Sequence, residues 1–408
     1  LSWILMSVIG CLPFVINGDI PHFADALFEM ISGFTTTGAT VVSDVEGLTK
    51  GSLFWRSFSH WIGGMGVLVF LLAIVPMAGG SHMNLMKAES PGPSVGKLVP
   101  KVRQTAKYLY IIYFTLTMIE VIFLLFGGMN LFEALTTSFG TAGTGGFAIW
   151  NDGFVSVSPY NQWVVTIFML LFGVNFGFYF LILTGKLRDA LKFEEVRIYF
   201  IIVIASAVFI FINLRHFALY APVEGIRQAF FQVASIITTT GFASADFNLW
   251  PETSRTILVL LMFIGACAGS TGGGIKVSRF IIACKSFIKE IISYLHPRSV
   301  KKIKLEGKPL EHETLRATNV YFMTYMVIFA VSVLLVSIEN KDLVTNFAAV
   351  AATFNNIGPG LSLVGPMANF GHFTDFTKYI LMFDMLAGRL EIFPMMLLFC
   401  PAVWKRRR

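Results

Sequence analysis

Apolar runs of nearly the length of a membrane span recur along this chain of 408 residues, and they restrict it to a narrow set of folds. A helix needs about 20 predominantly apolar residues to cross the hydrocarbon core of a bilayer. Charged residues make up 13% of the sequence, whereas a typical soluble domain contains about 25%. We therefore expect an integral membrane protein with spans at 67–75, 108–126, 164–183, 199–212, 257–268, 321–337 and 379–399, some of them shortened by glycine or polar residues.

The charged residues are distributed by side of the membrane. Most of the 31 basic residues lie in four clusters, at 87–107, 186–197, 285–316 and 405–408. Lysine and arginine are enriched in cytoplasmic loops, so these clusters are expected to face the cytoplasm. The segments between them carry mainly acids, such as Glu29, Asp44 and Glu133, and an acidic outer mouth raises the local concentration of cations. This topology accounts for the net charge of +7 without a nucleic-acid partner.

Each outward excursion of the chain contains a similar polar motif with glycine. The four motifs are FTTTGAT (34–40), GTAGTGGFA (140–148), ITTTGFA (237–243) and FNNIGPG (354–360). The glycine after each polar pair is taken as the anchor, which gives Gly38, Gly145, Gly241 and Gly358. Each motif follows a stretch that is too short to cross the membrane, at 25–33, 131–139, 225–236 and 342–354. Such a stretch can enter the membrane as half a helix and return as extended chain if its backbone is buried in protein or lines a wet cavity.

These features predict an all-α integral membrane protein built from four pseudo-repeats around one central pore. Each pseudo-repeat consists of a span, a pore helix, a filter loop and a second span, as in the pore of voltage-gated channels. The boundaries are expected at 1–80, 81–185, 186–297 and 298–408. A single TTTGA motif is explained equally well as a polar kink between packed membrane helices, but four copies in equivalent positions favour the pore.

The motif is suited to binding a dehydrated monovalent cation. Backbone carbonyls from four converging loops can replace the water around the ion, and glycine readily adopts the backbone angles that turn successive carbonyls toward one axis. Threonine hydroxyls can add ligands or hold the loop to its helix. The predicted filter residues are Thr36, Thr37, Gly38, Thr144, Gly145, Thr239, Thr240, Gly241, Asn356, Ile357 and Gly358.

Seven motifs in order along the chain carry a family resemblance. They are SGFTTTGAT (32–40), HWIGGMGVLV (60–69), ESPGP (89–93), QAFFQVASIITTTGFA (228–243), GACAGSTGGGIKVSR (265–279), NNIGPGL (355–361) and GRLEIF (388–393). The chain resembles the membrane subunits of bacterial Trk potassium uptake systems, the TrkH family within the Trk/Ktr/HKT superfamily of cation transporters. The resemblance implies a multi-pass protein of the bacterial inner membrane that translocates K⁺ as a homodimer with one pore in each subunit. Relatives that prefer sodium often carry serine at the first filter glycine, which here is Gly38.

The resemblance also implies a cytosolic partner. TrkA-type regulatory subunits with nucleotide-binding domains would dock on the cytoplasmic loops 81–107 and 297–313. NAD(H) or ATP would then bind to the partner, and no organic cofactor is expected in this chain. Attraction to anionic membrane lipid is the alternative role of the same loops.

The glycine-rich stretch 265–279 interrupts what would otherwise be a long span. Each glycine costs about 1 kcal/mol relative to alanine in a helix, so a helix does not easily continue through it. The stretch fails the nucleotide P-loop pattern, because Ile275 follows Gly274 and Val277 follows Lys276. The resemblance supports an intramembrane loop that obstructs ions under the filter, and Lys276 and Arg279 are expected to snorkel to the cytoplasmic interface. The expected body of this gate consists of Gly269, Ser270, Thr271, Gly272, Gly273 and Gly274.

Arg389 is the second gate candidate, because an arginine inside an apolar span is expensive and usually faces a wet interior or a partner. In the family the matching arginine borders the pore, which implies a barrier to cations. The alternative is an intramembrane ion pair with Asp384 or Glu391.

Two rival functions remain open at the level of the residues. A sodium-permeable or proton-coupled cation symporter of the same superfamily would use Glu120 or Asp384 as a titrating group, although an acid that completes a hydrogen-bond network explains Glu120 equally well. A membrane enzyme is not expected, because the 7 histidines are scattered and form no metal-binding or catalytic motif. The 4 cysteines also lack the spacing of metal ligands.

Overall fold

The computed structural model describes residues 2–66, 102–296, 302–390, 392–397 and 400–401, and this part of the chain is almost entirely helical. The predicted span at 67–75 and the ESPGP motif lie outside the described residues, as do most of the first cytoplasmic loop and the basic cluster 405–408. The described strands are limited to a small antiparallel hairpin of β1 (Lys304–Leu305) and β2 (Lys308–Pro309).

Three described helices are long and apolar enough to cross a membrane, and they contain three of the predicted spans. They are α6 (Val102–Phe126), α11 (Glu194–His216) and α15 (His312–Val336). The predicted spans at 108–126 and 199–212 are therefore confirmed as helical, and all but the last residue of 321–337 lies in α15. Exposed apolar side chains such as Phe126, Ile201 and Met323 lie on these helices, as expected for surfaces that face lipid.

Three other predicted spans are interrupted. The expected single span at 164–183 consists of α8 (Pro159–Phe172) and α9 (Phe176–Leu183), which are bent by 89°. Asn175 lies at this break and its side chain accepts from the Gly177 N–H at 2.7 Å, so it caps the new helix. In the span expected at 257–268, the helix α13 (Glu252–Met262) ends at Met262. The span expected at 379–399 is divided between α17 (Asp375–Arg389) and α18 (Ile392–Met396).

Four short helices occupy the positions of the predicted pore helices, which confirms the helical expectation for all four stretches. They are α2 (Phe23–Phe34), α7 (Leu131–Gly143), α12 (Pro222–Ile237) and α16 (Leu343–Phe354). Each continues into an extended loop, at 35–42, 144–148, 238–245 and 355–360. We call the four combinations helix–loop units 1 to 4.

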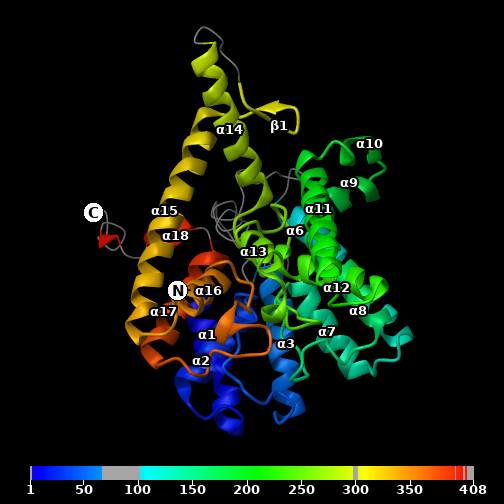
Figure 1. Ribbon diagram of the computed structural model, residues 1–408, viewed down its shortest axis with the longest axis vertical. Coiled ribbons are helices and arrows are strands. Elements are labelled where there is room, and N and C mark those ends of the chain that lie inside the picture. Colours follow the sequence, from blue (N-terminus) through cyan, green and yellow to red (C-terminus); the bar gives the residue numbers. More distant parts are fainter. Residues whose placement is uncertain (1, 67–101, 297–301, 391, 398–399, 402–408) are drawn as a thin grey trace.

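The remaining elements pack around these units or extend from them. In Figure 1, α14 and α15 run together to one end of the molecule, where the hairpin lies, while units 1 and 2 lie toward the other end. The short 3₁₀ helices lie within loops. The elements are α1 (Ser2–Asn17), α3 (Lys50–Gly64), α10 (Leu187–Ala190), α14 (Val277–Leu295), η1 (Phe247–Leu249), η2 (Ser337–Glu339) and η3 (Ser362–Val364).

The polar groups of the helix–loop units are buried at the centre of the protein. Thr36, Thr144, Thr239 and Asn356 are each 0% exposed, whereas large apolar side chains cover the outer helices. A polar interior inside an apolar exterior is the arrangement expected when a membrane protein surrounds a path for a polar solute.

Candidate functional site

The four loops begin with the same backbone conformation. Thr36, Thr144, Thr239 and Asn356 are left-handed, with φ between 54° and 59°. The next residue of each loop donates its N–H to the carbonyl five residues earlier, at 2.8–2.9 Å. These donors are Thr37, Gly145, Thr240 and Ile357, and the glycines that follow them, with φ between 76° and 94°, are Gly38, Gly146, Gly241 and Gly358.

This geometry corrects the predicted anchor of unit 2 by one residue. Gly146 corresponds to Gly38, whereas Gly145 corresponds to Thr37 and has no positive φ. The motif pattern points to the first glycine after a polar residue, but Thr144 is followed by two glycines, and only the backbone hydrogen bonds define which of them is equivalent. The other three predicted anchors are in register.

The four glycines bring the loops into a closed ring. A Cβ atom added to Gly38 would lie 1.9 Å from the Gly145 carbonyl oxygen. A Cβ added to Gly146 would lie equally close to the Thr240 carbonyl oxygen, and one added to Gly241 equally close to that of Ile357. The fourth glycine, Gly358, closes the ring, because a Cβ added to it would lie 2.8 Å from the Thr37 carbonyl oxygen. Each loop therefore touches the next one in chain order, at a separation that no side chain can occupy. We call these four residues the glycine ring.

A cavity opens against the glycine ring. Its volume is about 120 Å³, and its lining includes all four ring glycines together with Arg56 and Asn151. A site needs only roughly 10–15 Å³ of such volume to hold one water molecule, so this cavity has room for several waters or for a hydrated ion.

The predicted gate loop contacts the left-handed residues Thr144 and Thr239, which lie two positions before ring glycines. The Gly273 N–H donates to Thr239 Oγ1 at 2.7 Å, and the Thr144 hydroxyl donates to the Thr271 carbonyl at 3.0 Å. A Cβ on Gly272 would lie 3.1 Å from the Thr238 carbonyl oxygen, and Gly274 lies similarly close to Asn355. The structure thus brings Thr271 to Gly274 against three of the four units.

Gly269 and Ser270 lie at the edge of this contact instead. The Gly269 carbonyl accepts from the Phe176 N–H at 3.0 Å, at the break between α8 and α9. The Ser270 hydroxyl donates to the Cys267 carbonyl within the loop. These two of the six predicted gate residues therefore attach the loop to neighbouring backbone, and the other four lie at the ring.

Arg389 connects the gate loop to the end of α3. Its guanidinium donates to the Thr271 carbonyl at 2.7 Å and to the carbonyls of Gly63 and Gly64 at 2.5 and 2.8 Å. Among the ion pairs that the structure describes, none joins Arg389 to Asp384, whose carboxylate accepts from Ser332 Oγ at 2.6 Å. Glu391 lies outside the described residues.

Lys276 and Arg279 do not snorkel to the interface, which overturns that expectation. Lys276 is 0% exposed, and its ammonium donates to the carbonyls of Gly272 and Gly273. Arg279 is 6% exposed and stacks over the Tyr321 ring at 3.7 Å. Two cations, Arg389 and Lys276, consequently hold three successive carbonyls of the gate loop.

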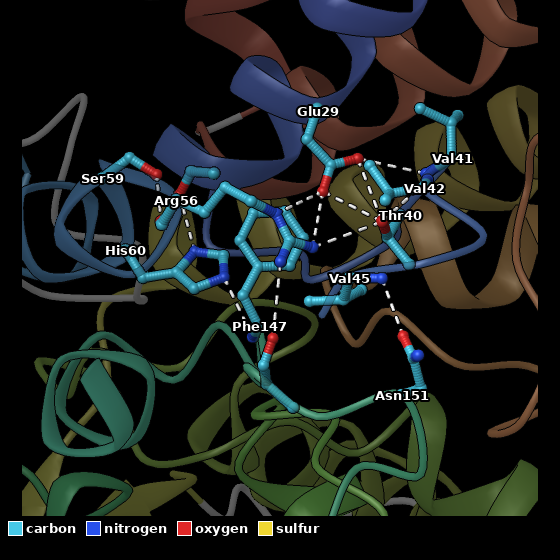
Figure 2. A network of polar contacts seen from close by, with 12 residues as sticks. Glu29, Thr40, Val41, Val42, Val45, Arg56, Ser59, His60, Phe147 and Asn151 are labelled. Atoms are coloured by element: carbon cyan, nitrogen blue, oxygen red, sulfur yellow. Dashed lines mark hydrogen bonds and ion pairs between the residues drawn. The ribbon is translucent and has the colours of Figure 1, made fainter. Parts of the chain in front are cut away.

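A buried ion pair beside the ring was not anticipated from the sequence. Glu29 is 0% exposed and pairs with Arg56, which is 2% exposed, at 2.7 Å, so its charge is compensated inside the protein. Figure 2 shows the Glu29 carboxylate between Arg56 and the outer part of the first loop, where it accepts from the Thr40 hydroxyl and the Val41 N–H. The sequence could have indicated this pair, because Glu29 and Arg56 lie in two segments with few charges, and charged residues are costly in a membrane unless they are paired.

Arg56 and His60 extend this connection to unit 2. Arg56 donates to the Ala148 carbonyl at 3.4 Å and lies 4.1 Å from the centre of the Phe147 ring. In Figure 2 the His60 ring lies between Ser59 and Phe147. The Phe147 N–H donates to Nε2 at 3.2 Å, so Nδ1 carries the proton and donates to the Gly33 carbonyl at 2.8 Å.

Two other polar groups have less defined roles. Glu120 is buried in α6, and neither of its carboxylate oxygens has a hydrogen-bond partner among the described residues.

His22, Asp25 and Asp375 form a cluster whose ligand atoms lie close enough together to hold a metal ion. The Lys378 ammonium already lies 2.5 Å from Asp25, so an internal cation neutralises one of the two carboxylates of this cluster.

Comparisons with known proteins show the family to which the chain belongs. The profile of a family described as TrkH, cation transport protein, matches residues 1–406. The chain is 38% identical to the Trk system potassium uptake protein TrkH of Escherichia coli strain K12, over 99% of this chain and 84% of the relative. It is 33% identical to the Trk system potassium uptake protein TrkG of the same strain, over 99% and 84% of the two chains.

A solved structure has the same fold. The crystal structure of the potassium transporter TrkH from Vibrio parahaemolyticus superposes with a TM-score of 0.88 and 34% sequence identity, and the match covers 99% of this chain and 84% of that one. The family match and these relatives define a membrane transport protein rather than an enzyme. The chain belongs to the TrkH family of cation transport proteins.

Proposed function

We propose that this protein translocates K⁺ across the bacterial inner membrane through one central pore formed by four repeats. The repeats correspond to 1–80, 81–185, 186–297 and 298–408, each contributing one helix–loop unit. The observation that carries the proposal is the glycine ring, because four loops from distant parts of the chain meet at distances of 1.9–2.8 Å from an added Cβ to the next carbonyl oxygen. The Trk system relatives are named as potassium uptake proteins.

The backbone of the ring would supply the ligands. Carbonyls of the loops replace the water of the entering ion, and the donor residues are those predicted, with Gly146 added beside Gly145. Because an added Cβ at Gly38 would meet the Gly145 carbonyl, a serine there would displace a ligand. We infer that glycine at all four positions keeps the ring suited to K⁺ over the smaller Na⁺.

The gate loop would block the path on the side of the ring opposite the cavity. Its contacts to Thr144 and Thr239 support a position directly under the loops. Arg389 adds a fixed positive charge there beside the basic Lys276, and a fixed charge repels a permeating cation at short range. Conduction would require this loop and its two cations to move.

We propose a homodimer with one pore per subunit, regulated by cytosolic TrkA-type subunits that bind NAD(H) or ATP. Anionic lipid is the competing partner for the basic cytoplasmic loops.

Uptake of labelled rubidium into proteoliposomes that contain the purified protein tests this function. Unlabelled potassium should block uptake, and sodium should not. Gly38→Ser should lower uptake and reduce this discrimination in the uptake that remains. Equal block by sodium in the unmodified protein would contradict a K⁺-selective filter.

A proton-coupled symporter is the second candidate, and the unpartnered carboxylate of Glu120 favours it. An imposed proton gradient should then drive rubidium uptake, and Glu120→Gln should remove this dependence. Uptake that follows only the potassium gradient and the membrane potential in both proteins would exclude this candidate.

A further inference from the structure

Glu195, in the first turn of α11, contacts both ends of the gate loop. The side chain is 3% exposed. One carboxylate oxygen, Oε1, accepts from the Ala268 N–H at 2.8 Å and from the Ser278 N–H at 2.9 Å. These two donors flank the Gly269–Gly274 stretch, so a single atom from another helix joins the entry and the exit of the loop.

The contact replaces a missing helix cap. The residue at the N-cap position of α14 is Lys276, whose side chain makes no capping hydrogen bond. The first N–H groups of a helix need acceptors, and a carboxylate there also interacts favourably with the helix dipole. Glu195 therefore stabilises the start of α14 from α11, at the point where the chain leaves the gate loop.

The neighbouring residue links the same turn of α11 to the cytoplasmic hairpin. Glu194 pairs with Lys285 of α14 at 2.5 Å, and the Lys285 ammonium also donates to the Lys304 carbonyl in β1 at 2.8 Å. The first turn of α11 thus lies between the hairpin and the gate loop. A displacement of α14 relative to α11 has to act on the Glu195 contacts.

We propose that Glu195 is a positioning residue that latches the gate loop in its blocking position beneath the glycine ring. Release of this latch, through movement of α14 and the hairpin against α11, frees both ends of the loop together. The inference that the latch controls conduction rests on the proposed ion-translocating function, whereas the attachment of the loop does not.

Hydrogen–deuterium exchange of the full-length protein tests the attachment. Glu195→Ala removes the acceptor, Glu195→Asp shortens it by one methylene, and Glu195→Gln keeps an oxygen at the same place. Exchange in peptides covering 265–279 should rise at least about tenfold in Glu195→Ala, because the variant loses both hydrogen bonds to this carboxylate and the loss of one alone shifts local opening by about that factor. Glu195→Gln should stay near the unmodified protein, and peptides covering 33–40 should not change in any variant.

Rubidium uptake without any regulatory subunit tests the control of conduction. Glu195→Ala should raise uptake, Glu195→Gln should restore the original rate, and competition between potassium and sodium should be the same in all variants. Should Glu195→Ala not fold, Glu195→Asp serves in both measurements, with the same direction expected.

Unchanged exchange in 265–279 would overturn the latch. Faster exchange with unchanged uptake in a conducting protein would overturn its role in gating. If no protein, including the unmodified one, takes up rubidium under an imposed potassium gradient, the proposed function fails, and the exchange result still decides whether Glu195 holds the loop.

Discussion

Units 1 and 3 differ from units 2 and 4 in how they support the same ring. In units 1 and 3 two threonine hydroxyls pair at 2.8 Å, Thr35 with Thr37 and Thr238 with Thr240. In each case the first threonine also donates to a carbonyl of its own helix at 2.7 Å. These two units, which do not follow one another in the ring, therefore connect loop and helix through their own side chains.

The outer parts of loops 1 and 3 are held in a related way. Glu29 of α2 accepts from the Val41 N–H at 3.1 Å. Gln232 occupies the corresponding place in α12, and with its amide oxygen oriented toward the donors it accepts from the N–H groups of Ser244 and Ala245 at 2.9 and 3.2 Å. The same brace is thus made once by a charged pair and once by a neutral amide.

Units 2 and 4 are supported from outside instead. Gly143 and Gly145 leave no room for a Cβ because His60 occupies that space, and Tyr325 of α15 donates to Asn355 Oδ1 at 2.9 Å in unit 4. Their short helices carry side-chain N-caps, Asn130 and Asp342, whereas no capping hydrogen bond is made by the N-cap side chain in α2 or α12. One backbone geometry is therefore stabilised in two different ways, and the difference can be measured.

The largest effect is expected where all four units are alike, at the glycine ring. Gly146→Ala should reduce rubidium uptake by more than about tenfold, because a positive φ alone costs about 1–2 kcal/mol in a residue with a side chain and the new Cβ meets the Thr240 carbonyl. Gly128→Ala is the matched control, since Gly128 has φ +84° and open space around it. Normal uptake in Gly146→Ala would contradict the assignment of Gly146 to the ring and favour Gly145 as the equivalent glycine of unit 2.

The next effect separates unit 1 from unit 3. Glu29→Ala should destabilise the detergent-solubilised protein by about 3–5 kcal/mol, because it leaves Arg56 buried without its partner. Gln232→Ala should cost only about 1–3 kcal/mol, the range for leaving buried donors unsatisfied. Thermal and denaturant unfolding would measure both. Equal losses would show that the charge of Glu29 adds nothing to the brace.

A smaller effect is expected from the hydroxyl pairs of units 1 and 3. Thr35→Val and Thr238→Val should each lower stability by about 1 kcal/mol and weaken discrimination between potassium and sodium in the uptake assay. Thr353→Val is the control in unit 4, because its hydroxyl bonds only to its own helix at 2.8 and 3.3 Å. A change in discrimination in the control and not in the pair would contradict this role.

The smallest effect concerns the cap of unit 4. Asp342→Ala should lower the free energy of unfolding by about 1 kcal/mol, as for other N-caps, and His22→Ala in unit 1 should lower it by less.

Hydrogen bonds from the side chain and backbone of Thr345 lower the pKa of Asp342 from its ordinary 3.8. A carboxyl with a lowered pKa stabilises the fold at pH values above its unfolded pKa, and this contribution is lost as the pH falls through the folded value. The cost of Asp342→Ala should therefore shrink below about pH 4, and a constant cost down to about pH 2 would argue against a charge-dependent cap.

Local patterns predicted the elements but not their contacts. The short helices and three of the long ones follow from apolar run length and from where polar motifs interrupt the runs, which are properties of neighbouring residues. The burial of Lys276 and the pair of Glu29 with Arg56 could not follow, because they depend on backbone and side chains far away in the chain. The break at Asn175 was missed for a similar reason, since an apolar run looks continuous while one side chain caps a new helix.

The sequence by itself determined a membrane protein with several apolar spans and four polar helix–loop motifs, because hydrocarbon admits only long apolar helices and tolerates glycine-rich turns only where protein covers them. Three of the four anchor glycines were recognisable from their motifs alone. Tertiary structure decided which of Gly145 and Gly146 completes the ring, which cations hold the gate loop, and that Glu195 joins its two ends. Those choices depend on distances between backbone groups of different units, and no local pattern of residue types encodes them.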